Sequence, residues 1–139
     1  MKDNNCIFCK IANGDIPSAT VCENEDCRVI LDMSPASRGH ALILPKQHFK
    51  DLCEADSDVS SKLLPLAGAV GTAMKKGLGA SGFNVVQNNG ASAGQTVFHL
   101  HIHVIPRYED GSSMVTWEPG KAGAEELEQT SELIRKELQ

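Results

Sequence analysis

Histidine and apolar residues alternate at period two from His99 to Val104, in the run HLHIHV. Successive side chains of a β-strand point to opposite faces of its sheet. The run therefore predicts a strand with His99, His101 and His103 on one face and three aliphatic side chains in a core on the other. Side chains on one face repeat about every 6.5–7 Å, which brings the three imidazoles close enough to serve one small ligand.

Other stretches of the chain show the patterns of strands and helices. Runs of β-branched and other apolar residues predict strands at residues 20–23, 28–33, 40–45 and 83–87.

Apolar residues at three- and four-residue steps predict three helices. A short helix is predicted within residues 5–13 and a long one within residues 51–79, where Pro65 predicts a kink or a division into two helices. A third helix is predicted over residues 122–138. Its modest apolar stripe consists of Leu127, Ile134 and Leu138.

Length and charge limit the classes of function. The chain has 139 residues, the size of one ordinary domain, so we expect a single domain over residues 1–139. The formal net charge is −5, which argues against broad binding of nucleic acids or anionic membranes because both need a basic surface. A small phosphate ligand held by a few local donors remains compatible with this charge.

The cellular setting follows from the same sequence. No apolar run approaches the roughly 18 residues of a membrane-spanning helix, and the polar start MKDNNCIFCK lacks the apolar segment of a signal peptide. Five cysteines, an odd number without a secretory signal, argue against a disulfide framework. We therefore expect a cytoplasmic protein in reducing surroundings, without a membrane partner.

Cys6 and Cys9 stand at the C-x-x-C spacing that lets two thiolates reach one metal ion. A closed tetrahedral zinc site needs two more ligands, which either Cys22 and Cys27 or a pair of histidines could supply. The alternative is a pair of free thiols. A thioredoxin-like redox site is disfavoured because no strand precedes the motif.

Two polar features near predicted strand ends each have a structural and a functional interpretation. Asp32 either caps the turn at Ser34-Pro35 or accepts hydrogen bonds from vicinal hydroxyls such as those of a ribose, and the residues by themselves favour the cap. The loop at residues 88–96 is either an ordinary Asn-Gly turn or a phosphate cradle. Its glycines let backbone amides approach a phosphate, and it leads directly into the histidine run.

Three interpretations of the histidine triad compete. The first is a structural cluster of hydrogen-bonded histidines, and the second is a water-activating metal site with three histidine ligands. The third uses one histidine as a nucleophile, while its neighbours orient it and donate hydrogen bonds to phosphate oxygens. The flanking loop of amides, glycines and a hydroxyl favours the third.

The run HLHIHVI resembles the signature of the histidine-triad nucleotide-binding proteins, in which three histidines alternate with apolar residues. The segments CIFCKIANGDIPSATVCENEDC, LDMSPASRGHALILPKQH and NNGASAGQTVFHLHIHVIPR resemble further blocks of the Hint-like branch of this family. The resemblance covers all but about the last 30 residues.

The resemblance implies an enzyme that binds a purine nucleoside monophosphate unit and cleaves a bond at the α-phosphorus. His101 is then the nucleophile that forms a phosphohistidine, and water releases the nucleoside monophosphate. His103 donates to non-bridging phosphate oxygens, His99 completes the triad, and Thr96 lies near the leaving group. The chemistry agrees, since a neutral imidazole held at one nitrogen by a backbone carbonyl presents its other nitrogen as a nucleophile.

The resemblance also implies the contacts to the substrate. Asp32 accepts the ribose hydroxyls, which reverses the preference for a cap. The phosphate contacts are Asn88, Gly94, Gln95 and Val97. The apolar pocket around the base consists of Ile7, Phe8, Ile11, Ile16 and Leu31.

Bacterial members with the Cys-x-x-Cys motif resemble this chain closely, and they imply a structural zinc ion that the chemical step does not need. The implied zinc ligands are Cys6, Cys9, His48 and His99. The family further implies a homodimer whose subunits have an α+β fold with a five-stranded antiparallel sheet, a long helix and a C-terminal helix.

One departure from the animal Hint enzymes concerns the leaving group. The triad continues as Ile105-Pro106-Arg107, where those enzymes have Gly-Gly-Arg. A Pro-Arg ending also occurs in the branch that hydrolyses dinucleoside polyphosphates. The sequence favours a purine-nucleoside phosphoramidase, with a dinucleoside polyphosphate hydrolase and a non-catalytic nucleotide-binding module as the alternatives.

Overall fold

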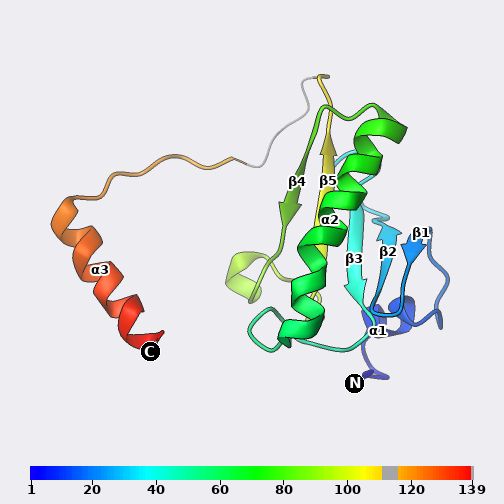
Figure 1. Cartoon of the computed structure of the whole chain (residues 1–139), viewed down its shortest axis with the longest axis horizontal. Coiled ribbons are helices and arrows are strands. Elements are labelled where there is room, and N and C mark those ends of the chain that lie inside the picture. The colour runs from blue at the N-terminus through cyan, green and yellow to red at the C-terminus, as the bar shows by residue number, and fades with distance from the viewer. Residues whose placement is uncertain (111–115, 139) are drawn as a thin grey trace.

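The computed structural model describes residues 1–110 and 116–138, and it has a five-stranded antiparallel sheet with a helix on each face (Figure 1). The strand order is β1-β2-β3-β5-β4. The strands are β1 (Thr20–Glu23), β2 (Cys27–Leu31), β3 (Ala41–Pro45), β4 (Gly82–Val86) and β5 (Ile102–Arg107). The helices are α1 (Ile7–Ala12), α2 (Ser57–Leu78) and α3 (Ala124–Glu137), with a short 3-10 helix, η1 (Ala91–Ala93). The expected α+β class and antiparallel sheet are confirmed.

Helix α2 covers one face of the sheet and forms the main core with it. The helix begins where the Asp56 side chain accepts a hydrogen bond from the backbone N–H of Val59, at 2.8 Å. It ends at Gly79, whose φ of 73° is the left-handed conformation that favours glycine. The buried stripe of α2 packs on β2, β3 and β5. It consists of Val59, Leu63, Ala67, Val70 and Met74.

Pro65 does not divide the long helix, so that alternative of the prediction is wrong. The helix is continuous from Ser57 to Leu78, with Pro65 on its exposed side. Proline removes one backbone hydrogen bond from a helix interior. Here Leu63 and Ala67, on either side of Pro65, are buried in the same core, so packing stabilises the helix on both sides of the proline.

Helix α1 covers the opposite face of the sheet with a smaller apolar cluster. Ala12 packs there against Ile30 of β2 and Leu42 of β3, and Phe8 and Ile11 lie against the same cluster. The sheet therefore separates two layers: the α2 layer contains the main core, and the α1 layer contains the histidine side chains described below.

Strand β5 begins three residues later than the histidine pattern predicts. His99 and His101 lie in the segment that leads into Ile102, which bends at residues 97–99 and is not part of the strand. The ladder with β3 cannot continue there, because the backbone carbonyl of Pro45 accepts a hydrogen bond from the His99 ring at 2.8 Å. The N–H of Leu100 bonds instead to the carbonyl of Phe49, at 2.7 Å. The predicted alternation nevertheless holds, since the three aliphatic residues of the run are buried in the main core.

Helix α3 confirms the predicted C-terminal helix but not a packed position for it. Among the described residues, α3 makes no contact with another element, and none of its residues is buried. Figure 1 shows it beyond the β4 edge of the sheet. Within residues 1–110 and 116–138, no helix has both the length and the apolar character needed to span a bilayer.

Candidate active site

The His101 ring is held in one tautomer by the main chain. Its Nδ1 lies 2.7 Å from the backbone carbonyl oxygen of His99. A carbonyl can only accept, so Nδ1 carries the proton and Nε2 keeps a free lone pair. The ring is only 8% exposed, and the edge of the Phe8 ring packs against it with centroids 5.0 Å apart. This arrangement holds Nε2 of His101, the nitrogen with the free lone pair, in one orientation.

The proton position on His103 follows from a chain of two hydrogen bonds that sequence analysis missed. The backbone N–H of Ala36 donates to Nδ1 of His40, at 2.9 Å. The remaining nitrogen of neutral His40, Nε2, therefore carries the proton and donates to Nδ1 of His103, at 2.9 Å. His103 in turn has its proton on Nε2 and can donate it to a ligand. His40 thus fixes His103 as a hydrogen-bond donor.

Burial keeps these rings neutral. Desolvation, followed by the charges of His101 and His40, lowers the pKa of His103 to about 4. The pKa of His40 is also lowered by burial, although Asp32 opposes that shift. Burial lowers the pKa of His99 to about 4. The tautomers assigned to His40, His99 and His103 are therefore those of neutral imidazoles at neutral pH.

Asp32 joins the same group through His40. Its Oδ2 lies 3.7 Å from Nε2 of His40, and its Oδ1 accepts a hydrogen bond from the backbone N–H of Ser34, at 2.8 Å. Asp32 therefore makes the predicted local cap and also lies beside the histidines. Its side chain is 22% exposed, so the carboxylate is accessible to a ligand.

The loop between β4 and the histidine run is shaped by Gln95. This side chain is 3% exposed. Its Nε2 donates to the carbonyls of Lys50 and Val97, and its Oε1 accepts from the N–H of Gly90. The Gln95 amide is thus used inside the protein. Gly94, with a φ of 93°, keeps the chain in a conformation that side chains rarely adopt.

The other residues of this loop that were predicted to contact the substrate are at least partly exposed. Asn88 is half-buried and near Gly94, Thr96 is exposed, and Val97 is half-buried. Thr96 and Val97 line a polar pocket that also contains Lys50 and His48.

Four of the five residues predicted for the base pocket lie in or just after α1. Phe8 lies against His101, Ile7 is exposed beside it on α1, and Ile11 is packed on the α1 layer. Ile16, in the loop after α1, is half-buried.

The placement of Leu31 in the base pocket is wrong. Leu31 lines a groove on the α2 side of the sheet, whereas Ile30 faces the α1 layer. The cause is the two-residue period of a strand, which puts neighbours on opposite faces. In an unbroken apolar run the sequence gives no sign of which residue faces which layer.

Cys6, Cys9, His48 and His99 form a second cluster beside the triad. One ligand atom from each lies within 4.8 Å of the others. Nδ1 of His99 is 3.4 Å from both sulfurs, and Nδ1 of His48 is 3.4 Å from Sγ of Cys9. Since Nε2 of His99 donates to the Pro45 carbonyl, Nδ1 has a free lone pair for a metal ion.

The cluster has the donor atoms and spacing of a tetrahedral zinc site. With Zn–S near 2.3 Å and Zn–N near 2.1 Å, a sulfur and a nitrogen ligand lie about 3.6 Å apart. Backbone N–H groups also point at both sulfurs, from Asp3 to Cys9 and from Cys9 to Cys6, each at 3.3 Å. These donors favour thiolates, while burial raises the pKa of Cys9. A cation would offset that burial.

The four-cysteine alternative does not fit the structure. Cys22 is exposed on β1, and Cys27 is buried in the main core of the α2 layer, where burial raises its pKa to about 11. The structure brings the histidine pair to Cys6 and Cys9 instead.

The chain is similar to proteins with known names and structures. The chain is 43% identical over 106 residues to an adenylylsulfatase of Arabidopsis thaliana, HINT3, a match that covers 76% of this chain but 54% of that protein. It is 36% identical to an adenosine 5'-monophosphoramidase of Schizosaccharomyces pombe, with 96% of this chain and 98% of that protein covered.

Solved structures extend the likeness. A crystal structure from Streptococcus mutans has a TM-score of 0.93 and 37% identity, and the match covers 99% of this chain and 88% of that one. The matched 99% of this chain includes α3. A Zn-bound histidine triad protein from Mycobacterium smegmatis has a TM-score of 0.75 and 36% identity, with 83% and 84% coverage.

The sequence model of the HIT domain matches residues 13–110, which include Asp32, His40 and all three triad histidines. The family match and the relatives agree with the resemblance seen in the sequence. This chain belongs to the HIT family.

Proposed function

We propose that this protein hydrolyses purine nucleotide derivatives at the α-phosphorus through a phosphohistidine intermediate, with nucleoside phosphoramidates as the favoured substrates. The observation that carries the proposal is the His101 ring, whose Nδ1 is hydrogen bonded to a backbone carbonyl and whose Nε2 is free. The names of the two relatives support it, since one is an adenylylsulfatase and the other an adenosine 5'-monophosphoramidase.

The reaction follows from the tautomers. Nε2 of His101 attacks the α-phosphorus, an N–P bond forms, and the bond to the leaving group breaks as that group takes up a proton from solvent water. His103 donates its Nε2 proton as a hydrogen bond to a non-bridging oxygen, where charge grows in the transition state. Water then attacks the phosphorus, restores His101 and releases the nucleoside monophosphate. We place Thr96 near the leaving group.

The substrate contacts are assigned in the same way. Asp32 accepts the ribose hydroxyls, and the base lies over Ile7, Phe8, Ile11 and Ile16, with Ile30 rather than Leu31 beneath it. Asn88, Gly94 and Val97 contact the phosphate. Because the Gln95 amide is already used in three hydrogen bonds, we assign Gln95 to shaping the phosphate loop.

We further propose that Cys6, Cys9, His48 and His99 hold a structural zinc ion. The Zn-bound relative and the spacing of the four ligand atoms support it. Bound zinc would tie α1 to the segment that carries the triad. His99 itself serves the nucleophile through its backbone carbonyl.

We also infer that residues 1–139 form a single HIT domain that works as a homodimer, without nucleic acid or membrane partners. Sedimentation velocity tests the dimer directly. A sedimentation coefficient of the monomer at micromolar concentrations would contradict it.

The His101→Ala variant tests the nucleophile. We expect release of AMP from adenosine 5'-phosphoramidate to be abolished while AMP binding, measured by calorimetry, is retained. Turnover that persists in the variant would exclude His101 as the nucleophile, and binding without turnover in the wild type would favour a non-catalytic nucleotide-binding module. A panel that compares phosphoramidates with diadenosine polyphosphates decides between the two leaving groups that the Pro106-Arg107 ending leaves open.

A further inference from the structure

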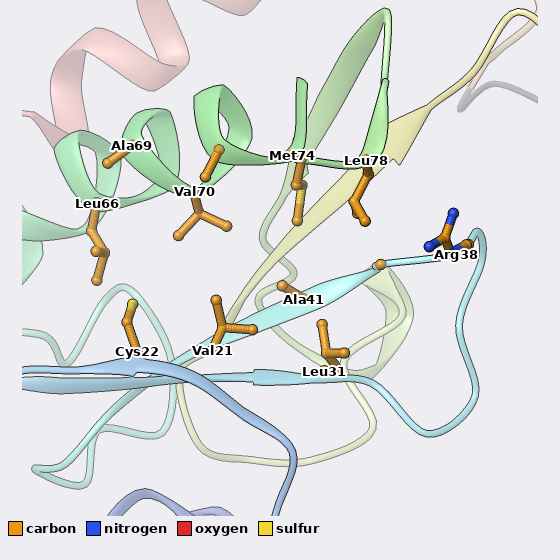
Figure 2. A pocket seen from close by; sticks show the side chains of 12 residues that line it. Val21, Cys22, Leu31, Arg38, Ala41, Leu66, Ala69, Val70, Met74 and Leu78 are labelled. Carbon is orange, nitrogen blue, oxygen red and sulfur yellow. The ribbon is translucent and has the colours of Figure 1, made fainter. Parts of the chain in front are cut away.

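An apolar groove lies on the α2 face of the sheet, on the side away from the histidines. It encloses about 640 Å³ between α2 and strands β1, β2 and β3. Figure 2 shows Leu66, Val70, Met74 and Leu78 of α2 pointing toward Val21 and Leu31, with Arg38 at one end of the row. The proposed chemistry uses none of these side chains.

The groove leaves apolar surface uncovered. Val21 is 51% exposed and Leu31 is 40% exposed. On the helix side, Ala69 and Ala73 are exposed and present only methyl groups to the groove. The short side chains leave room for bulkier ones from outside, and a contiguous exposed apolar patch of this kind is typical of an interaction site.

Helix α3 has the complementary feature, an apolar stripe with no partner. Leu127, Ile134 and Leu138 are 57%, 58% and 81% exposed. At 3.6 residues per turn they lie within roughly 40° of one another around the helix. Helices of about this length are marginal in water when unpacked. Since α3 makes no contact with another described element, it needs a surface to pack on.

The stripe and the groove match in length and charge. From Leu66 to Leu78 the groove side of α2 measures about 18 Å, and from Leu127 to Leu138 the stripe measures about 16 Å. Helix α3 has five glutamates against Arg135 and Lys136. The groove has Arg38 in its lining, and its basic surroundings also include the last turn of α2. The basic residues of that turn are Lys75 and Lys76.

The placement of α3 points to a second copy of the chain as the partner. Figure 1 shows α3 beyond the β4 edge, whereas β1 and β2, which form one wall of the groove, lie at the opposite edge of the sheet. The match to the Streptococcus mutans crystal structure covers 99% of this chain with a TM-score of 0.93, so α3 is part of the matched fold.

We propose that α3 of one copy docks its Leu127–Ile134–Leu138 stripe into the α2 groove of a second copy. The exchange is reciprocal in a twofold dimer, so each copy both gives a helix and receives one. This inference concerns assembly and is independent of the proposed catalytic chemistry.

Crosslinking tests which chain supplies the helix. Cys22 is an exposed, free thiol in the groove lining. In a Cys53→Ser background, Ile134→Cys adds a thiol on the stripe, and Leu133→Cys, about 100° away around the helix, is the matched control. We expect a short bismaleimide to give a species of twice the chain mass on a denaturing gel with Ile134→Cys. The species should be lost when Cys22→Ser is added, and it should be weak with Leu133→Cys.

Hydrogen exchange of α3 gives a second measurement that does not depend on the crosslinker. The α3 amides should be protected in the wild type and in Leu133→Asp, and protection should be lost in Leu127→Asp/Ile134→Asp and in the groove variant Ala73→Trp. A crosslink confined to single chains would overturn the proposal in favour of docking within one copy. Unprotected α3 amides in the wild type, or protection that survives Ala73→Trp, would overturn the groove as the docking site.

Discussion

Replacing His40 tests whether the hydrogen-bond chain sets the proton on His103. In the structure Ala36 N–H donates to His40, and His40 donates to Nδ1 of His103, both at 2.9 Å. In His40→Ala the Nδ1 of His103 loses its donor. The His103 ring is then free to carry its proton on Nδ1. In that tautomer Nε2 has a lone pair and cannot donate a hydrogen bond to the phosphate of the substrate.

The size of the effect follows from one lost hydrogen bond in a buried setting. Leaving such a group unsatisfied costs about 1–3 kcal/mol, and about 1.4 kcal/mol corresponds to a tenfold change in rate. We therefore expect kcat/KM for adenosine 5'-phosphoramidate to fall by roughly 10- to 100-fold. That loss is smaller than the loss expected for His101→Ala, which removes the nucleophile itself. His40→Gln keeps an amide donor near the same place and should recover part of the activity.

Activity alone does not separate positioning from a general loss of stability, so the assay needs a second readout. Nitrogen-15 shifts of the imidazoles report the tautomer directly. The wild type should show His103 protonated on Nε2, and His40→Ala should show a mixture of both tautomers at a temperature where the variant is fully folded. If His40→Ala is folded and keeps its kcat/KM within about twofold, or if the His103 tautomer is unchanged, the hydrogen-bond chain does not control the site.

Three further predictions concern metal binding and stability. Cys6→Ser should abolish stoichiometric zinc in metal analysis, and Cys22→Ser should leave it unchanged; equal loss in both would contradict the assigned ligands. Gly71→Val should lower the free energy of unfolding by about 1–3 kcal/mol, because a Cβ at this position would clash with the ring of Phe83 on β4. Its control Gly68→Val, where a Cβ meets nothing within 4 Å, should change stability by less than about 0.5 kcal/mol in urea titrations. Because the pKa of His103 is about 4 in the folded protein and near 6.5 when unfolded, the unfolded chain binds more protons between these values, so stability should fall as the pH drops from 6.5 to 4. The loss from this half-buried ring should be about 1–2 kcal/mol, and a urea midpoint that is flat over this range, or that falls equally in His103→Asn, would contradict it.

Local patterns in the sequence predicted much of the fold. The period-two run gave the correct sides for the histidines and the aliphatic residues, even though His99 and His101 lie outside strand β5. Leu100, Ile102 and Val104 are all buried in the main core, although only the last two lie in the strand. The Cys-x-x-Cys motif likewise indicated a metal site, because two thiols on one turn of α1 must lie close together.

The features missed by sequence analysis depend on contacts between distant segments. His40 is far from His103 in sequence and opens an apolar strand, so no local pattern distinguishes it from a buried structural residue. Only the pairing of β3 with β5 brings the two rings together. For α3, the stripe was visible in the sequence but its lack of a partner was not, because local periodicity marks the face that packs and not the surface on which it packs.

The hydrogen bond from the His101 ring to the backbone carbonyl of His99 means that the residue at position 99 has two separate roles, one for its backbone and one for its side chain. The orientation of His101, the proposed nucleophile, depends on the backbone carbonyl of position 99, which every amino acid possesses, whereas the proposed metal site depends on the imidazole side chain there. A coordinated replacement of the four ligand side chains by a well-packed apolar set would therefore leave the orientation of His101 intact. The proposed metal site and the proposed chemistry beside it therefore make separate demands on the residue at position 99.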